Sequence, residues 1–137
     1  MQNENQEFVI YRYGLAWSEA ATTLTKLLNQ GGSLDEAGRK SLQVAHESCL
    51  WARREILEDT EIGMQIHRVI QPLYRRESLL TMLDKADEYL LCLFKSPAAL
   101  ESVTLDRPQL AWLVETLSDL CILLLREIAT RRLAITV

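Results

Sequence analysis

Apolar residues recur every three or four positions along most of this 137-residue chain. That spacing gathers them on one face of an α-helix, because a helix turns once in about 3.6 residues. Residues 8–29, 33–59, 77–95 and 107–132 keep the pattern over a helical length. The sequence therefore predicts an all-α fold, namely an antiparallel four-helix bundle. The clearest packing seam lies in the second segment, at Leu42, Ala45, Cys49, Ala52 and Ile56.

The first two predicted helices have identifiable ends. In the first helix, we expect the core to be formed by Phe8, Leu15, Leu24, Leu27 and Leu28. Glycine tolerates the left-handed backbone that ends helices, so the pair at residues 31–32 ends this helix. Ser33 and Glu36 then have the spacing of a capping box, which predicts Ser33 as the N-cap of the second helix.

Proline and serine mark the later boundaries. Residues 60–76 keep helical spacing, but Gly63 weakens it and Pro72 interrupts it, so we expect a short extra helical segment that bends near Pro72. Ser96 and Pro97 predict a short turn through residue 100. By the same logic, Asp106 opens the last long helix.

Composition agrees with few, long elements in one domain. Five glycines and three prolines leave little material for turns. A length of 137 residues suits a single domain, so we expect one bundle over residues 1–137. Residues 1–6 are polar, and we expect them to be disordered.

The net charge and the cysteines limit which partners and which cellular compartment we expect. The formal net charge is −4, and the three arginine pairs have acidic neighbours, so we expect no nucleic-acid partner. The longest apolar run, residues 120–125, is too short for a membrane span, and the polar N-terminus is no signal peptide. Three widely spaced cysteines indicate reduced thiols rather than a disulfide framework or a zinc site. We therefore expect a cytoplasmic protein with no membrane partner.

Common cofactor motifs are missing. The two histidines, His46 and His67, are not preceded by glutamate at the spacing that di-iron bundles use, and no haem, zinc-protease or phosphate-loop motif occurs. We therefore predict no cofactor and lean against an enzyme.

Two acidic pairs support an alternative interpretation. Glu55 and Glu58 on the second helix, with Asp84 and Asp87 on the third, could hold Mg²⁺ through carboxylate oxygens. This arrangement resembles the all-α nucleoside triphosphate pyrophosphatases of the MazG type, whose helices carry E-x-x-E and E-x-x-D motifs. The resemblance implies a Mg²⁺-dependent enzyme. Helical geometry opposes it, because Glu55 and Glu58 point away from the seam of their helix.

A second resemblance involves Arg39 and His46. Their spacing resembles the R-x4-6-H signature of HEPN-type ribonucleases, in which the arginine and the histidine act together on a phosphate. Lys40 stands where that family usually has a polar, uncharged residue. The competing interpretation is a solvent-facing histidine.

Two charged residues share the apolar sides of their helices. Asp87 lies among leucines of the third helix, and Arg53 lies among apolar residues of the second. A buried charge is costly unless it is paired. We therefore predict a structural Arg53–Asp87 ion pair, with a functional role for Asp87 as the alternative.

The last helix carries the candidate partner surface. Trp112, Ile122 and Leu123 interrupt its polar face, which is an informative kind of apolar exposure. Either another segment of the chain covers this stripe, or it binds a partner. We favour a non-enzymatic helical protein-binding module, such as a regulator, an adaptor or an assembly chaperone. Its partner would be another protein or a second copy in a homodimer.

Overall fold

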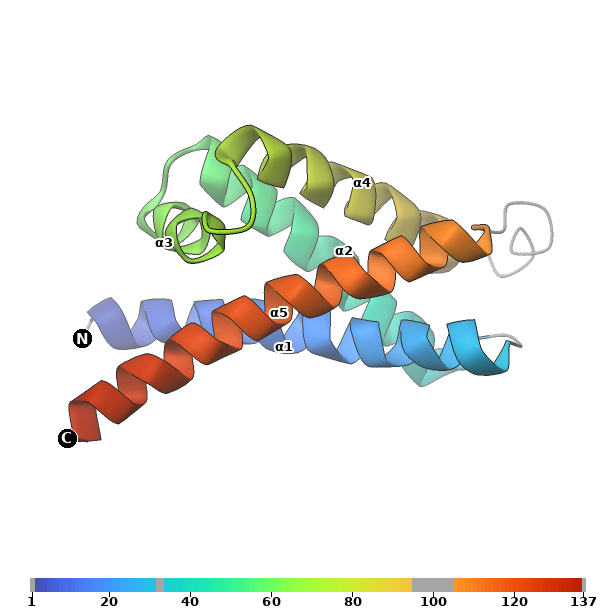
Figure 1. The fold of residues 1–137 in the computed structure, drawn as a ribbon, viewed down its shortest axis with the longest axis horizontal. Helices are drawn as coiled ribbons and strands as arrows, with labels where there is room; N and C mark the ends of the chain where they lie inside the picture. Colours follow the sequence, from blue (N-terminus) through green and yellow to red (C-terminus); the bar gives the residue numbers. More distant parts are fainter. Residues whose placement is uncertain (1, 32–33, 95–104, 137) are drawn as a thin grey trace.

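Five helices form the part of the chain that the structure, a computed structural model, describes: residues 2–31, 34–94 and 105–136. No strand occurs among these residues. The prediction of an all-α bundle is confirmed, with four long helices and a short one between the second and third (Figure 1). The helices are α1 (Gln2–Gln30), α2 (Glu36–Leu57), α3 (Glu61–Ile70), α4 (Arg76–Phe94) and α5 (Arg107–Thr136).

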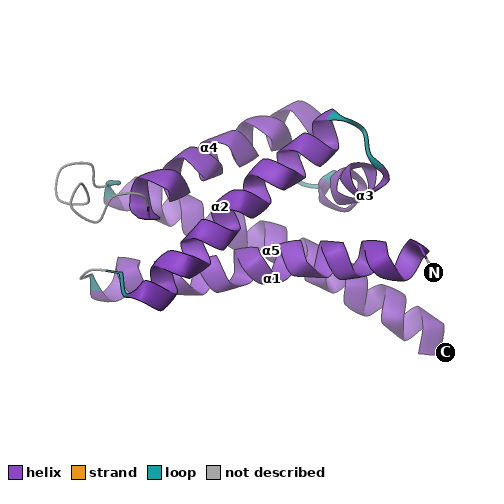
Figure 2. Cartoon of the chain, turned by 180° about the vertical axis from the view of Figure 1, so that it is seen from behind, coloured by secondary structure: helices purple, strands orange, loops and turns teal. Residues whose placement is uncertain are grey.

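The long helices form two antiparallel pairs that cross one another. α1 packs most extensively on α5, and α2 packs on α4 (Figure 1). α2 also contacts α1, and α3 lies across one end, against α2 and α5. Seen from behind, α2 runs in front of the α1–α5 pair (Figure 2). The start of α1 and the end of α5 lie at the same end of the molecule.

The core lies between the two pairs. The seam predicted for α2 is buried in full, from Leu42 to Ile56. In α1, however, the buried face carries Ile10, Trp17 and Leu24, which are seven residues apart. The expectation that Phe8 and Leu15 anchor α1 in the core is wrong, because both project from the opposite face and are exposed.

The start of α1 and the capping residue of α2 differ from those predicted. α1 begins at Gln2, within the stretch for which we expected disorder. Ser33 lies outside the described residues, and the N-cap of α2 is Asp35, whose Oδ1 accepts a hydrogen bond from the Gly38 N–H at 2.7 Å. The turn predicted for residues 96–100 also lies outside the described part.

The start of α5 follows the predicted logic. The Asp106 carboxylate accepts from the Gln109 N–H at 2.8 Å, and the Gln109 side-chain oxygen accepts from the Asp106 N–H at 2.9 Å. This reciprocal capping box satisfies two backbone donors that a helix start would otherwise leave free.

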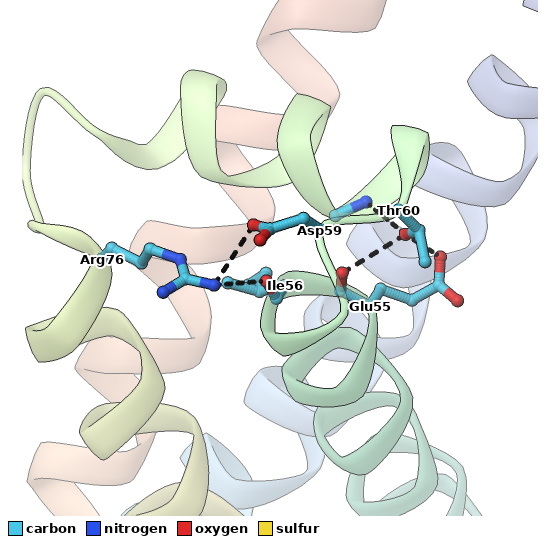
Figure 3. A network of polar contacts seen from close by, with 6 residues as sticks. Glu55, Ile56, Asp59, Thr60 and Arg76 are labelled. Carbon is cyan, nitrogen blue, oxygen red and sulfur yellow. Dashed lines mark hydrogen bonds and ion pairs between the residues drawn. The ribbon is translucent and has the colours of Figure 1, made fainter.

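The junction between α2 and α3 is held by polar contacts (Figure 3). Asp59 has a left-handed backbone, with φ of 52°, and Thr60 caps α3 by accepting from the Gly63 N–H at 3.0 Å. The Thr60 hydroxyl also donates to the Glu55 carboxylate at 2.7 Å. From the other side, the Arg76 guanidinium donates to the Ile56 carbonyl at 2.9 Å and to Asp59 Oδ1 at 3.2 Å. These contacts fix the direction in which the chain enters α3.

Candidate functional site

One face of α1 presents large apolar side chains to solvent. Phe8, Tyr11 and Leu15 recur at three and four residues and therefore form a single stripe. Their exposed fractions are 60%, 40% and 39%. An exposed stripe of this kind is unusual on a helix whose opposite face already supplies the core, and it typically marks a contact surface. We call it the α1 face.

α5 extends the α1 face on one side. Gly14 of α1 lies so close to Leu125 of α5 that an added Cβ would stand 2.9 Å from the leucine side chain. Leu15 follows Gly14, and Ile122 precedes Leu125 by about one turn. Ile122 is 49% exposed, and like Leu15 it lies beside the contact between Gly14 and Leu125.

α2 borders the α1 face on the other side. A groove of about 290 Å³ lies on the surface between α1 and α2, with Val9 and Arg12 on one wall and Val44 and Trp51 on the other. Trp51 is 56% exposed, and the Arg54 guanidinium lies 5.8 Å from its ring centroid. Apolar exposure thus continues from α1 onto α2.

The α1 face also carries two opposite charges. Arg12 and Glu19 are both exposed, and the Arg12 guanidinium carbon lies 6.0 Å from the centroid of the Phe8 ring. A cation over an aromatic face is held by the quadrupole of the ring. The α1 face therefore combines aromatic and aliphatic groups with charged ones, and protein interfaces likewise join an apolar core to a polar rim.

The residues predicted as the partner surface do not form one stripe. Trp112 and Leu123 pack partly buried against the core, whereas Ile122 is exposed. Trp112 lies against Tyr89 and Lys85 of α4, so another segment of the chain covers it, as the first of the two alternatives expected. Of the three, only Ile122 borders the α1 face.

Sequence reasoning missed the α1 face because it assigned Phe8 and Leu15 to the core. The signal was present in the chain. Ile10, Trp17 and Leu24 repeat every seven residues and define a competing stripe that contains the larger tryptophan.

The predicted Arg53–Asp87 ion pair is replaced by two others. Asp87 pairs with His46, and their side chains are only 15% and 13% exposed. Arg53 faces Asp84 instead, with Nε 4.0 Å from Oδ1, in a more exposed setting. Both pairs join α2 to α4, so the prediction found the right helices and the wrong partners.

Burial sets the protonation preference of Asp87. It raises the pKa of this carboxyl above its ordinary 3.8, against the lowering effect of His46; Asp84 raises the pKa further, and Arg53 lowers it. Burial outweighs the attraction because the partly buried carboxylate loses hydration that favours its charged form. Ionised Asp87 is thus a cost to the fold that its partners offset only in part.

Stability should therefore depend on pH through Asp87. A carboxyl whose pKa is raised on folding contributes stability below its unfolded pKa of about 3.8, and this contribution is lost as the pH rises through the folded pKa. The Asp87→Asn variant has no titratable group at this position in either the folded or the unfolded state. We expect the free energy of unfolding of the wild type, relative to Asp87→Asn, to fall as the pH rises above about 3.8 and through the raised pKa of the folded carboxyl. Urea unfolding at several pH values measures this difference, and a difference that grows with pH would contradict it.

The four carboxylates of the alternative metal site do not come together. Glu55 accepts from Thr60, Glu58 pairs with Arg54 at 3.1 Å, and the two aspartates pair with different residues of α2. Among the described residues, no three acidic, histidine or cysteine side chains are grouped as metal ligands. The arrangement that would resemble the pyrophosphatases is therefore wrong in its geometry.

Arg39 and His46 face the same helix with different roles. Arg39 Nη2 donates to the Phe94 carbonyl at the end of α4, at 3.3 Å. The His46 ring lies 5.1 Å from the Phe94 ring, and its Nδ1 contacts Asp87. The interpretation of His46 as solvent-facing is wrong, because the α2–α4 contact covers its ring.

The three cysteines are free thiols. Cys49 is buried among α1, α2 and α4, and burial raises its pKa to about 12, with a further contribution from the charge of Asp87. A thiol that stays protonated at neutral pH is a poor nucleophile and metal ligand. Cys49 therefore serves the core.

Within the part of the chain that the structure describes, one helix meets a simple criterion for a membrane span. Arg107–Arg132 of α5 is long and apolar enough to cross a bilayer by length and composition alone. The core helix of a bundle meets the same criterion, and Leu113, Leu117, Leu120 and Leu124 of α5 are fully buried in this one. The finding is weak evidence for a membrane location.

Comparison with known proteins identifies no relative. No protein family matches the chain, and no curated protein or solved structure matches it significantly.

Proposed function

We propose that this chain is a helical protein-interaction module that acts as a homodimer, with the α1 face as the interface. One observation carries the proposal: the α1 face exposes large apolar side chains, and two exposed residues of opposite charge, Arg12 and Glu19, lie about one turn before and one turn after Leu15. Such a surface is complementary to a second copy of itself. A symmetric dimer uses the same patch on both subunits, so self-complementarity is its basic requirement.

The charges define a register. Arg12 lies about one turn before Leu15 and Glu19 about one turn after it, on the same flank of the face. If two α1 helices pack antiparallel with Leu15 near the two-fold axis, Arg12 of each copy lies opposite Glu19 of the other. Opposite charges favour this register, whereas a parallel arrangement would place like charges together.

The apolar residues supply the attraction. Phe8, Tyr11 and Leu15 are exposed along two turns of helix, and Ile122 borders them on α5. Aromatic and large aliphatic side chains at the centre of an interface carry most of its binding energy. Removing them from water favours association, while the charges select orientation and partner.

Charge reversal tests both the dimer and its register. We expect the wild type to sediment as a dimer. Arg12→Glu and Glu19→Arg should each weaken it by about tenfold or more, because each places like charges at two symmetric contacts. An equimolar mixture of the two variants should recover the dimer, since every contact in the heterodimer again joins opposite charges. Sedimentation velocity over a concentration series measures all three samples.

The control is Arg75→Glu, which makes the same charge change at an exposed residue between α3 and α4, away from the α1 face. It should leave the dimer unchanged. A wild type that is monomeric at high concentration would contradict the homodimer. A dimer that tolerates both single reversals would place the interface elsewhere.

A further inference from the structure

A second surface lies between α4 and α5, apart from the α1 face. These helices make few direct contacts with each other, because α4 packs on α2 and α5 packs on α1. The gap is a groove of about 420 Å³. It is lined by Tyr74, Glu77, Ser78, Thr81, Met82, Lys85 and Trp112.

Two aromatic rings form a corner at this groove. Tyr89 and Trp112 meet edge to face, with ring centroids 5.5 Å apart and planes inclined by 77°. Lys85 extends its ammonium over both rings, and Nζ lies 4.5 Å from the Trp112 centroid and 5.6 Å from the Tyr89 centroid. The chain's own ammonium group therefore occupies a cation–π position between two rings.

The surroundings of the corner are negatively charged. Glu77 lines the groove from α4. On the α5 side, Asp119 and Glu115 lie near Tyr74: burial raises the pKa of this phenol, and the charges of the two carboxylates raise it further. One carboxylate thus lines the groove and two others lie near it, whereas among the described lining residues Lys85 is the only cation, and its side chain is exposed.

We infer that this groove binds an organic cation with a methylated ammonium head, and that Lys85 is an internal competitor for the same position. A primary ammonium is compact and strongly hydrated, so Lys85 gains little by leaving water for the rings. A methylated ammonium is weakly hydrated and spreads its charge over methyl groups that contact aromatic faces well, which is how aromatic cages recognise such cations. The carboxylates attract the ligand, and the exposed lysine can swing away.

Removal of the competitor is the direct test. Choline and a blocked trimethyllysine serve as probes, one a free small molecule and the other a side chain of a peptide. Binding is followed by the NMR shifts of the Trp112 indole N–H and the Tyr89 ring. We expect saturable shifts in the wild type and tighter binding in Lys85→Met. The gain is about tenfold if Lys85 occupies the rings nine-tenths of the time.

Two controls separate recognition of the cation from non-specific contact. The uncharged isostere of choline, with carbon in place of the quaternary nitrogen, should give no saturable shift. Trp112→Phe keeps an aromatic ring and should weaken binding, and Trp112→Leu should abolish it while the far-ultraviolet circular dichroism and the melting temperature show a folded protein. If Trp112→Leu unfolds, Trp112→Phe and the isostere still show whether binding requires the indole ring and the positive charge.

The outcomes are distinct. Stronger binding of trimethyllysine than of choline identifies a methylated protein segment as the ligand, and the reverse identifies a small molecule. Equal shifts from choline and its isostere would overturn the proposal. So would the lack of saturable binding in Lys85→Met. Neither result bears on the homodimer, because the groove and the α1 face share no residue.

Discussion

Gly63→Ala should lower the free energy of unfolding by about 3 kcal/mol, the upper part of the usual range for overpacking. A Cβ at this position would stand 2.1 Å from the Glu55 carbonyl oxygen and 2.7 Å from the Ile56 nitrogen. Both atoms belong to the backbone of α2 and cannot rotate away. α3 must therefore move off the end of α2, which also disturbs the Thr60 cap (Figure 3).

The intrinsic helix preference of alanine works against this result. In an unconstrained helix, alanine is more favourable than glycine by about 1 kcal/mol. The matched control is Gly38→Ala in α2, where the added Cβ would meet only side-chain atoms, the nearest being Asp35 Oδ1 at 3.0 Å. We expect Gly38→Ala to stay within about 1 kcal/mol of the wild type. Urea unfolding followed by circular dichroism measures both variants. Equal stability of Gly63→Ala and the wild type would show that α2 and α3 do not approach so closely.

Gly63 also illustrates what the sequence could and could not predict. A lone glycine inside a helical pattern indicates either a weak point or a close approach. The sequence favoured the weak point, since nothing in local spacing shows which element lies opposite. The existence of the helices was predictable, because each has its own periodic apolar face. The contact that requires glycine depends on the tertiary arrangement.

The ion pairs show the same limit of the sequence, which predicts the helices that pack together but not the position of one along the other. Hydrophobic spacing places Arg53 on the apolar side of α2 and Asp87 on the apolar side of α4, so the α2–α4 contact was predictable. The choice of partner requires the axial position of one helix along the other. A slide of about one turn, or 5.4 Å, changes which charges meet, while leaving a leucine-rich seam nearly as well packed. The sequence pattern does not resolve that slide.

The cover over Trp112 was not predictable for a related reason. Trp112 interrupts the polar face of α5, but the residues that cover it, Lys85 and Tyr89, belong to α4. Periodicity identifies an apolar position without naming its neighbour. In α1, by contrast, two apolar stripes compete for the core, and only packing decides that the stripe with Trp17 is buried and the one with Leu15 is exposed.

A double-mutant cycle on His46 and Asp87 should give a coupling energy of about 1–3 kcal/mol, the range for residues in direct polar contact. His46→Leu leaves the Asp87 carboxylate without its partner in a site that is only 15% exposed, and should cost about 3 kcal/mol, as for a broken buried pair. Replacing both residues with leucine removes the charge together with its partner, so the double variant should lose far less stability than the two single variants lose together.

The comparison cycle on Arg53 and Asp84 should give a coupling of about 0.5 kcal/mol or less, because the two side chains are 41% and 68% exposed and water screens their attraction across 4.0 Å. Free energies of unfolding from urea titrations at one pH supply every corner of both cycles. Additive effects at His46 and Asp87 would show that the two residues do not interact. A larger coupling between Arg53 and Asp87 would restore the ion pair that the sequence predicted and would shift α4 along α2 by about one turn.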